Sequence, residues 1–223
     1  MPDSPTQTVT VRAVLFDMDG TLVDSTEVVE SMWAAFAERF GVDLTALLAY
    51  SHGRQTRDTV ARFLPPGPDP DRVVADFERA ELVRVDGVRE IPGAAWLLAS
   101  LASAPVAVVT SASRELAEVR LRAAGLAVPD VLVPADEITR GKPDPQGYLL
   151  AADRLGVSPA DCVVLEDAAA GIEAGVAAGG HTLVVGAHRS AITRGLPRVP
   201  DLSTVSATVT DDGAIRLSWP ATE

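Results

Sequence analysis

The chain has 223 residues, enough to bury a substantial core, and with 47% hydrophobic and 4% aromatic residues it is globular, with Ala, Val and Leu as its main core residues. It carries 19 Lys and Arg residues against 31 Asp and Glu residues, and the formal net charge of -12 argues against nucleic acid as a partner. A single cysteine, Cys162, and 3 scattered histidines exclude an internal disulfide and form no zinc pattern, so we expect a reducing, cytoplasmic setting.

Neither a secretory signal nor a membrane span is expected. The N-terminal residues MPDSPTQTVTVR include Asp3 and lack an apolar block, which argues against a signal peptide. Residues 94–112 are uncharged over almost the length of a span, but Pro105 divides them. A helix before Pro105 and a strand after it explain this stretch better.

Apolar runs and helical patterns alternate along most of the chain. Continuous apolar runs, typical of strands covered on both faces, occupy residues 11–17, 106–110, 131–136, 162–167 and 181–186. Helical patterns fill the gaps, and those at 113–125 and 144–156 each end in a glycine suited to cap a helix. The alternation predicts an α/β fold with a doubly wound parallel sheet.

Residues 26–85 interrupt this alternation because their pattern is helical only. We predict an inserted all-helical domain there, with a loop at 65–71 (PPGPDPD), between two parts of the α/β core formed by residues 1–25 and 86–223. The four phenylalanines of the insertion are expected to form its own core: Phe36, Phe40, Phe63 and Phe77. Residues 202–223 alternate around Asp212 and Gly213, which predicts a β-hairpin attached to the core.

Polar residues that could take part in catalysis or metal binding follow the predicted strands at four places. They are Asp17 and Asp19 in FDMDGTLVDS, Thr110 and Ser111 in VAVVTS, Lys142 in RGKPDP, and Glu166 and Asp167 in CVVLED. Because the carboxyl ends of parallel strands point the same way, we expect these residues at one edge of the sheet. Carboxylates gathered around one lysine, with no thiol or histidine, favour a hard divalent cation, and Mg²⁺ is the usual choice beside a phosphate.

Such a set of groups suits phosphoryl transfer. Asp17, at a strand tip, is placed to attack phosphorus and form an acyl phosphate. Asp19 is placed to protonate the leaving oxygen and later to deprotonate a water molecule. Lys142 and the metal would neutralise the transferring group, while the Thr110 hydroxyl and nearby backbone N–H groups hold its oxygens.

The four stretches resemble the four motifs of the haloacid dehalogenase superfamily, in that family's order and over the chain up to about Ala187. The resemblance implies that Asp17 is the phosphorylated nucleophile and Asp19 the acid/base and a main-chain metal ligand. It also implies that Asp17, Asp19, Asp167 and the nearby Glu166 form the Mg²⁺ site.

The inserted helices resemble the cap of the phosphoglycolate-phosphatase and β-phosphoglucomutase subgroup, which closes over substrate and excludes water. Dehalogenases of this fold lack the second carboxylate of the first motif, whereas Asp19 is present here. Mutases of the subgroup usually carry a histidine where this chain has Val29, so hydrolysis is favoured. Phosphoglycolate phosphatase and sugar-phosphate mutase activities remain alternatives.

The segment SHGRQTRDTVARFLP, residues 51–65, is similar to the cap segment of small polyol and sugar phosphatases that act on glycerol phosphates, 2-deoxyglucose 6-phosphate or hexitol phosphates. The candidate substrate-binding residues are His52, Gly53, Arg54 and Arg57 from the cap, with Ser111 and Ala112 from the core. We therefore expect a Mg²⁺-dependent phosphatase for a small phosphorylated metabolite, monomeric or weakly dimeric. A phosphate-binding regulatory protein with slow turnover is the alternative of another class.

Overall fold

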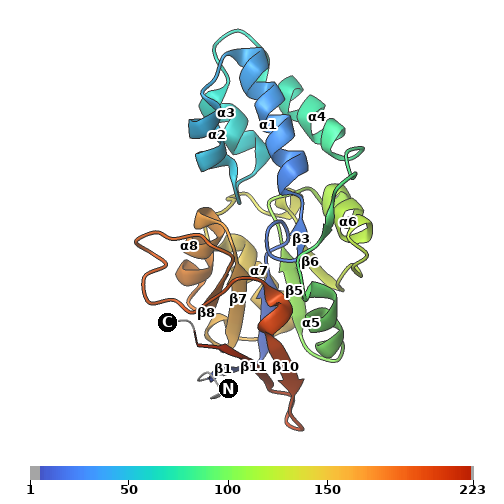
Figure 1. The fold of residues 1–223 in the computed structure, drawn as a ribbon, viewed down its shortest axis with the longest axis vertical. Helices are drawn as coiled ribbons and strands as arrows, with labels where there is room; N and C mark the ends of the chain where they lie inside the picture. The colour runs from blue at the N-terminus through green and yellow to red at the C-terminus, as the bar shows by residue number, and fades with distance from the viewer. Residues whose placement is uncertain (1–5, 222–223) are drawn as a thin grey trace, which may run out of the picture.

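A computed structural model describes residues 6–221, and its body is a parallel sheet with helices on both sides (Figure 1). The main sheet has 6 strands in the order β6-β5-β2-β7-β8-β9, and all neighbouring pairs are parallel. Its strands are β2 (Ala13–Phe16), β5 (Val106–Val109), β6 (Val131–Val133), β7 (Cys162–Glu166), β8 (His181–Val185) and β9 (Arg198–Val199). The predicted doubly wound parallel sheet is confirmed.

The central strand β2 is buried on both faces. Val14 and Phe16 pack in one apolar core with side chains of α5 (Ala94–Ser100) and α6 (Arg114–Ala123). Ala13 and Leu15 pack on the other face with side chains of α7 (Gln146–Leu155) and α8 (Ala169–Ala178). Because both faces are covered, the strand is an unbroken apolar run rather than an alternating one.

The predicted helical insertion is confirmed as a separate group of helices on the far side of the strand ends (Figure 1). It contains α1 (Thr26–Phe40), α2 (Leu44–Ser51), α3 (Thr56–Phe63) and α4 (Pro70–Glu81). Its core is formed by Trp33, Phe36, Leu47 and Val60, against which the other three predicted phenylalanines pack. The predicted loop is shorter than 65–71, because Asp69 caps α4 and Pro70 occupies its first turn.

Two short strands join the insertion to the sheet. The chain leaves through β3 (Val23–Asp24) and returns through β4 (Arg89–Glu90), and these strands pair antiparallel. The Arg89 guanidinium donates a hydrogen bond of 2.7 Å to the Asp24 carboxylate across the pair. The outgoing and returning segments are therefore tied together where the chain passes between the sheet and the insertion.

The predicted C-terminal hairpin is formed by β10 (Ser206–Val209) and β11 (Ile215–Pro220). It belongs to a separate 3-stranded sheet in which β11 also pairs with β1 (Thr6–Val11). This small sheet lies at the end of the molecule away from the inserted helices (Figure 1). Residues 222–223 of the predicted tail, and residues 1–5 of the predicted core, lie outside the described residues.

Two of the predicted strands are wrong by more than one residue. Residues 11–17 do not form one strand: β1 ends at Val11, and the chain crosses to the main sheet at Arg12. Arg12 N–H donates to the Asp161 carbonyl at 2.7 Å, and its side chain donates to the Asp212 carbonyl at 2.8 Å. The predicted strand 131–136 ends at Val133, because Pro134 supplies no N–H for the ladder.

The remaining short elements are 3₁₀ turns: η1 (Ala135–Glu137), η2 (Pro159–Asp161) and η3 (Leu202–Thr204). The uncharged stretch 94–112 forms α5, a turn and β5, as predicted. Among the helices of residues 6–221, none has both the length and the apolar character needed to cross a membrane.

Two glycines test how tightly the C-terminal segment packs against α5. Gly93 and Gly179 both have φ +89°, but a Cβ on Gly93 would lie 2.4 Å from the Leu202 carbonyl carbon, whereas Gly179 has nothing within 4 Å. Gly179→Ala should lower the free energy of unfolding by about 1 kcal/mol through backbone strain alone. Gly93→Ala should cost about 3 kcal/mol, because a steric clash adds to the strain. Urea unfolding measures both, and equal costs would contradict the packing of η3 on α5.

Candidate active site

The candidate site lies at the carboxyl edge of the sheet, where the strand order reverses around β2. Asp17 directly follows β2, and its N–H donates to the Leu165 carbonyl of β7 at 3.0 Å. Thr110 directly follows β5, and Glu166 ends β7. Since β5 and β7 lie on opposite sides of β2, these residues meet at the switch point of the sheet, where open α/β folds bind ligands.

The Lys142 ammonium lies at the centre of this group and is only 4% exposed. It donates to the Asp17 carboxylate, to Glu166 Oε1 at 2.6 Å and to the Val109 carbonyl at 3.2 Å. Tyr148 on α7 donates its hydroxyl to the same Glu166 oxygen at 2.8 Å. One buried cation thus holds the carboxylates of two neighbouring strands.

Glu166 is completely buried and receives hydrogen bonds on both oxygens. Besides Lys142 and Tyr148 on Oε1, the N–H groups of Asp167 and Ala168 donate to Oε2 at 3.0 and 3.2 Å. These donors lie where the chain enters α8. The arrangement makes Glu166 an anchor for Lys142, beneath the carboxylates that face the cavity.

The carboxylates outnumber the cation. Asp17, Glu166 and Asp167 each place a carboxylate oxygen within 4.8 Å of the others. Burial, followed by the charge of Glu166, raises the pKa of Asp17 to about 8, although Lys142 opposes the shift. Burial and the Asp17 charge likewise raise the pKa of Asp167 well above its usual range. Burial opposes the charge on Lys142, but the two carboxylates that it contacts outweigh burial and raise its pKa.

This donor set fits a hard divalent cation such as Mg²⁺. All the ligand atoms are oxygens, and a cation would offset the burial and the repulsion between carboxylates that together favour protonation. Gly20 has φ +91°, and a Cβ there would lie 2.1 Å from the Asp167 carboxylate. Glycine therefore allows the turn after Asp19 to approach Asp167.

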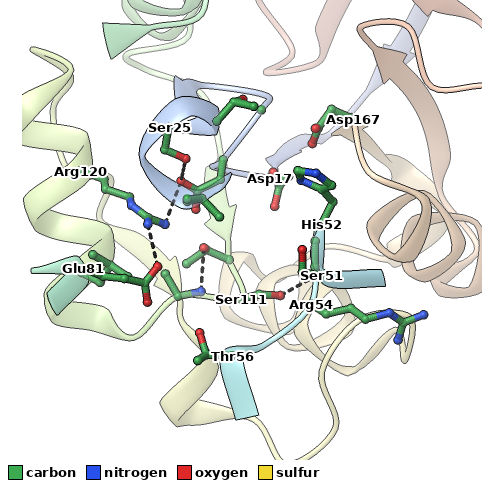
Figure 2. Close-up of a pocket in the computed structure, with 18 of the residues that line it drawn as sticks. Asp17, Ser25, Ser51, His52, Arg54, Thr56, Glu81, Ser111, Arg120 and Asp167 are labelled. Carbon is green, nitrogen blue, oxygen red and sulfur yellow. Dashed lines mark hydrogen bonds and ion pairs between the residues drawn. The ribbon is translucent and has the colours of Figure 1, made fainter. Parts of the chain in front are cut away.

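Asp19 belongs to a second charged cluster. Its Oδ1 accepts from the Ser25 hydroxyl at 2.6 Å and from Arg120 Nη1 at 3.1 Å. Arg120 Nη2 also donates to Glu81 at 2.8 Å, so the guanidinium lies between Ser25 and Glu81 in Figure 2. Burial raises the pKa of Glu81 to about 7 against the opposing effect of Arg120.

Sequence reasoning missed Ser25, Glu81 and Arg120. A signal for Arg120 exists, because it shares the buried face of α6 with Leu116, Ala117 and Leu121, where a charged residue needs a partner. The partners themselves come from distant segments and leave no local pattern.

A cavity of about 100 Å³ separates the sheet edge from the inserted helices. The predicted residues that line it are Asp17, Asp19, Thr110, Ser111, Ala112 and Asp167 from the core and His52, Gly53 and Arg54 from the insertion. Lys142 and Glu166 lie behind Asp17, outside the lining. Arg57 is exposed on α3 and does not line the cavity.

The predicted insertion residues differ in orientation. The Ser111 hydroxyl donates to the Gly53 carbonyl at 2.8 Å, which joins the core to the loop after α2. His52 Nε2 lies 3.4 Å from the Glu30 carboxylate. Arg54 stacks over the Tyr50 ring, with 4.4 Å from Cζ to the ring centroid, and points away from Asp17 in Figure 2.

Residues 11–179 match the family model described as haloacid dehalogenase-like hydrolase. Hexitol phosphatase A of Escherichia coli is 42% identical over 181 residues, covering 79% of this chain and 83% of that protein. The 2-deoxyglucose-6-phosphate phosphatase 1 of Saccharomyces cerevisiae is 36% identical over 192 residues, covering 76% and 77% of the two chains.

Among solved structures, CbbY from Rhodobacter sphaeroides in complex with phosphate superposes with a TM-score of 0.70 at 28% identity, covering 86% of this chain and 95% of CbbY. The family match extends over the strands that carry Asp17, Thr110 and Glu166, the residues that the fold brings to one edge. This chain belongs to the haloacid dehalogenase-like hydrolase family.

Proposed function

We propose that the protein hydrolyses phosphate monoesters of small polyols or sugars through a phosphorylated Asp17, with Mg²⁺ as cofactor. The observation that carries this proposal is the Asp17 carboxylate at the switch point of the sheet, held from behind by Lys142 and open to the cavity in front. A nucleophile in this position meets a substrate phosphate directly, and the names of the two enzyme relatives support the ester class.

In the proposed reaction an Asp17 oxygen bonds to phosphorus while the bond from phosphorus to the ester oxygen breaks. Asp19 gives its proton to the departing oxygen. Asp19 then takes a proton from a water molecule that attacks phosphorus, which releases inorganic phosphate and restores Asp17. Lys142 offsets the charge, and the Thr110 hydroxyl and the Ser111 N–H bind the phosphoryl oxygens, while the Ala112 N–H donates to Thr110 Oγ1 at 3.1 Å.

The metal would be held by Asp17, Asp167 and the main chain at Asp19, with Glu166 close by. Bound there, Mg²⁺ would neutralise charge on the phosphoryl oxygens. The donor set supports this choice, because it contains oxygen only and carries more negative charge than Lys142 balances.

The substrate class follows from the insertion, which we propose acts as a cap, residues 26–85, that excludes water. The cavity is small for a ligand site and is lined from the insertion by Ser51, His52 and Thr56, which suit hydroxyl groups. The hydrophobic side chain of Val29 also lines it and cannot exchange protons with a second sugar hydroxyl. A hydrolase for a polyol or sugar phosphate fits this lining better than a mutase.

Asp17→Asn should abolish phosphate release from p-nitrophenyl phosphate and from a panel of glycerol, hexitol and hexose phosphates, because an amide is a poor nucleophile. The matched control is Asp153→Asn, the same chemical change on the exposed face of α7, which should retain full activity. Release of inorganic phosphate is measured for each variant. Substantial activity in Asp17→Asn would remove Asp17 as nucleophile, and accumulation of a hexose 6-phosphate from a hexose 1-phosphate would show a mutase.

Mg²⁺ should stabilise the protein more as pH rises. The pKa of Asp17 is raised from 3.8 to about 8 without metal, so the folded chain keeps a proton that the unfolded chain loses in this window. The free energy of unfolding therefore falls with rising pH, and a bound cation that replaces the proton restores it. Melting temperatures with and without Mg²⁺ at about pH 6 and about pH 8 measure the effect.

Asp167→Asn should reduce the Mg²⁺ shift at both pH values, whereas Asp153→Asn should leave it intact. A shift in melting temperature that is no larger at the higher pH would contradict the placement of the cation among these carboxylates.

A further inference from the structure

Arg120 is a buried cation at the junction of the core and the insertion, and the proposed reaction assigns it no contact with the phosphoryl group. It is 4% exposed, lines the cavity, and bonds to Asp19 at 3.1 Å and to Glu81 at 2.8 Å. We propose that Arg120 is a positioning residue that orients the acid/base Asp19. Through its ion pair with Glu81, this orientation depends on α4 of the insertion lying against the core. This inference rests on the proposed function.

The contacts fix one oxygen of Asp19 and leave the other for proton transfer. Ser25 and Arg120 both donate to Oδ1, from the turn before α1 and from α6. Turning the carboxylate would break both hydrogen bonds, one of which is charge-assisted. With Oδ1 occupied, the Oδ2 atom is the oxygen available to exchange a proton with a leaving group in the cavity.

Glu81 extends this control to the insertion. It is the last residue of α4 and is 5% exposed, so its carboxylate and the Arg120 guanidinium compensate each other away from water. If the end of α4 moves away, Arg120 loses one of its two anionic partners and its fixed position. The orientation of Asp19 therefore depends on the place of α4, although Asp19 itself belongs to the core.

A second ion pair on α6 is exposed and joins residues of the same helix only. Arg122 donates to Glu118 one turn away at 2.7 Å, and its side chain is 64% exposed. This pair does not line the cavity. Arg122→Met therefore removes the same charge from α6 without touching Asp19, and it serves as the matched control for Arg120→Met.

The test compares leaving groups. A sugar or polyol alkoxide needs a proton from Asp19 to depart, whereas p-nitrophenolate departs with little help. For wild type and each variant, kcat/KM is measured with glycerol 1-phosphate and with p-nitrophenyl phosphate, because this constant covers the steps through phosphoryl transfer. Arg120→Met should lower the glycerol-to-nitrophenyl ratio about tenfold, and Glu81→Gln about threefold, since general acid catalysis contributes 10²–10⁴-fold. Arg122→Met should leave the ratio unchanged.

A ratio unchanged in Arg120→Met, whatever the total loss of activity, would overturn the proposal, because a structural role would affect both substrates equally. Should Arg120→Met fail to fold, the double variant Arg120→Met with Glu81→Met removes both buried charges and is judged by the same ratio. Arg120→Lys, a point charge that cannot bridge two carboxylates, should restore only part of the ratio. If the wild type hydrolyses neither ester, the proposed function fails and this inference falls with it.

Discussion

The structure depends on one buried ammonium among carboxylates. Lys142 reaches the tip of β2 from the loop before α7 and bonds to Asp17 and Glu166, and among residues 6–221 neither carboxylate pairs with another cation. Two buried carboxylates would be too costly to place side by side without it. Asp167 adds a third carboxylate beside this single lysine, and the three carboxylates together could hold a divalent cation. Charge balance at the strand ends thus links the fold to the chemistry.

The topology places these charges, and the insertion covers them. Parallel strands on both sides of β2 bring their carboxyl ends to one edge, and the chain leaves that edge through β3 and returns through β4. The two segments that connect the insertion to the core therefore lie next to Asp19. The Ser111 contact with the loop after α2 and the Arg120 contact with the end of α4 join the two parts on different sides of the cavity. In such a layout, the contacts that hold the insertion against the core also hold Asp19 in place.

The sequence predicted those site residues that can be recognised from their immediate neighbours along the chain. Asp17, Thr110 and Asp167 directly follow buried apolar strands, and the rule that parallel strand ends converge was enough to group them. It did not find Arg120 or Glu81, because their partners are 101 and 39 residues away along the chain and only packing brings them together. The sequence also could not predict side-chain direction: the Arg54 guanidinium lies over the Tyr50 ring, an interaction that depends on the fold. The break at Arg12 was missed because Val11 and Ala13 are both buried, although they belong to different sheets.

The covalent role of Asp17 is the central claim, and mass spectrometry of acid-quenched enzyme tests it most directly. Wild-type protein is mixed with Mg²⁺ and a polyol phosphate, quenched in acid during turnover, which preserves an acyl phosphate, and digested. A phosphoryl group on the peptide that contains Asp17, and its absence when substrate is omitted, is the predicted result. A phosphoryl group on another residue, or turnover with none trapped on any peptide at the earliest quench times, would contradict it.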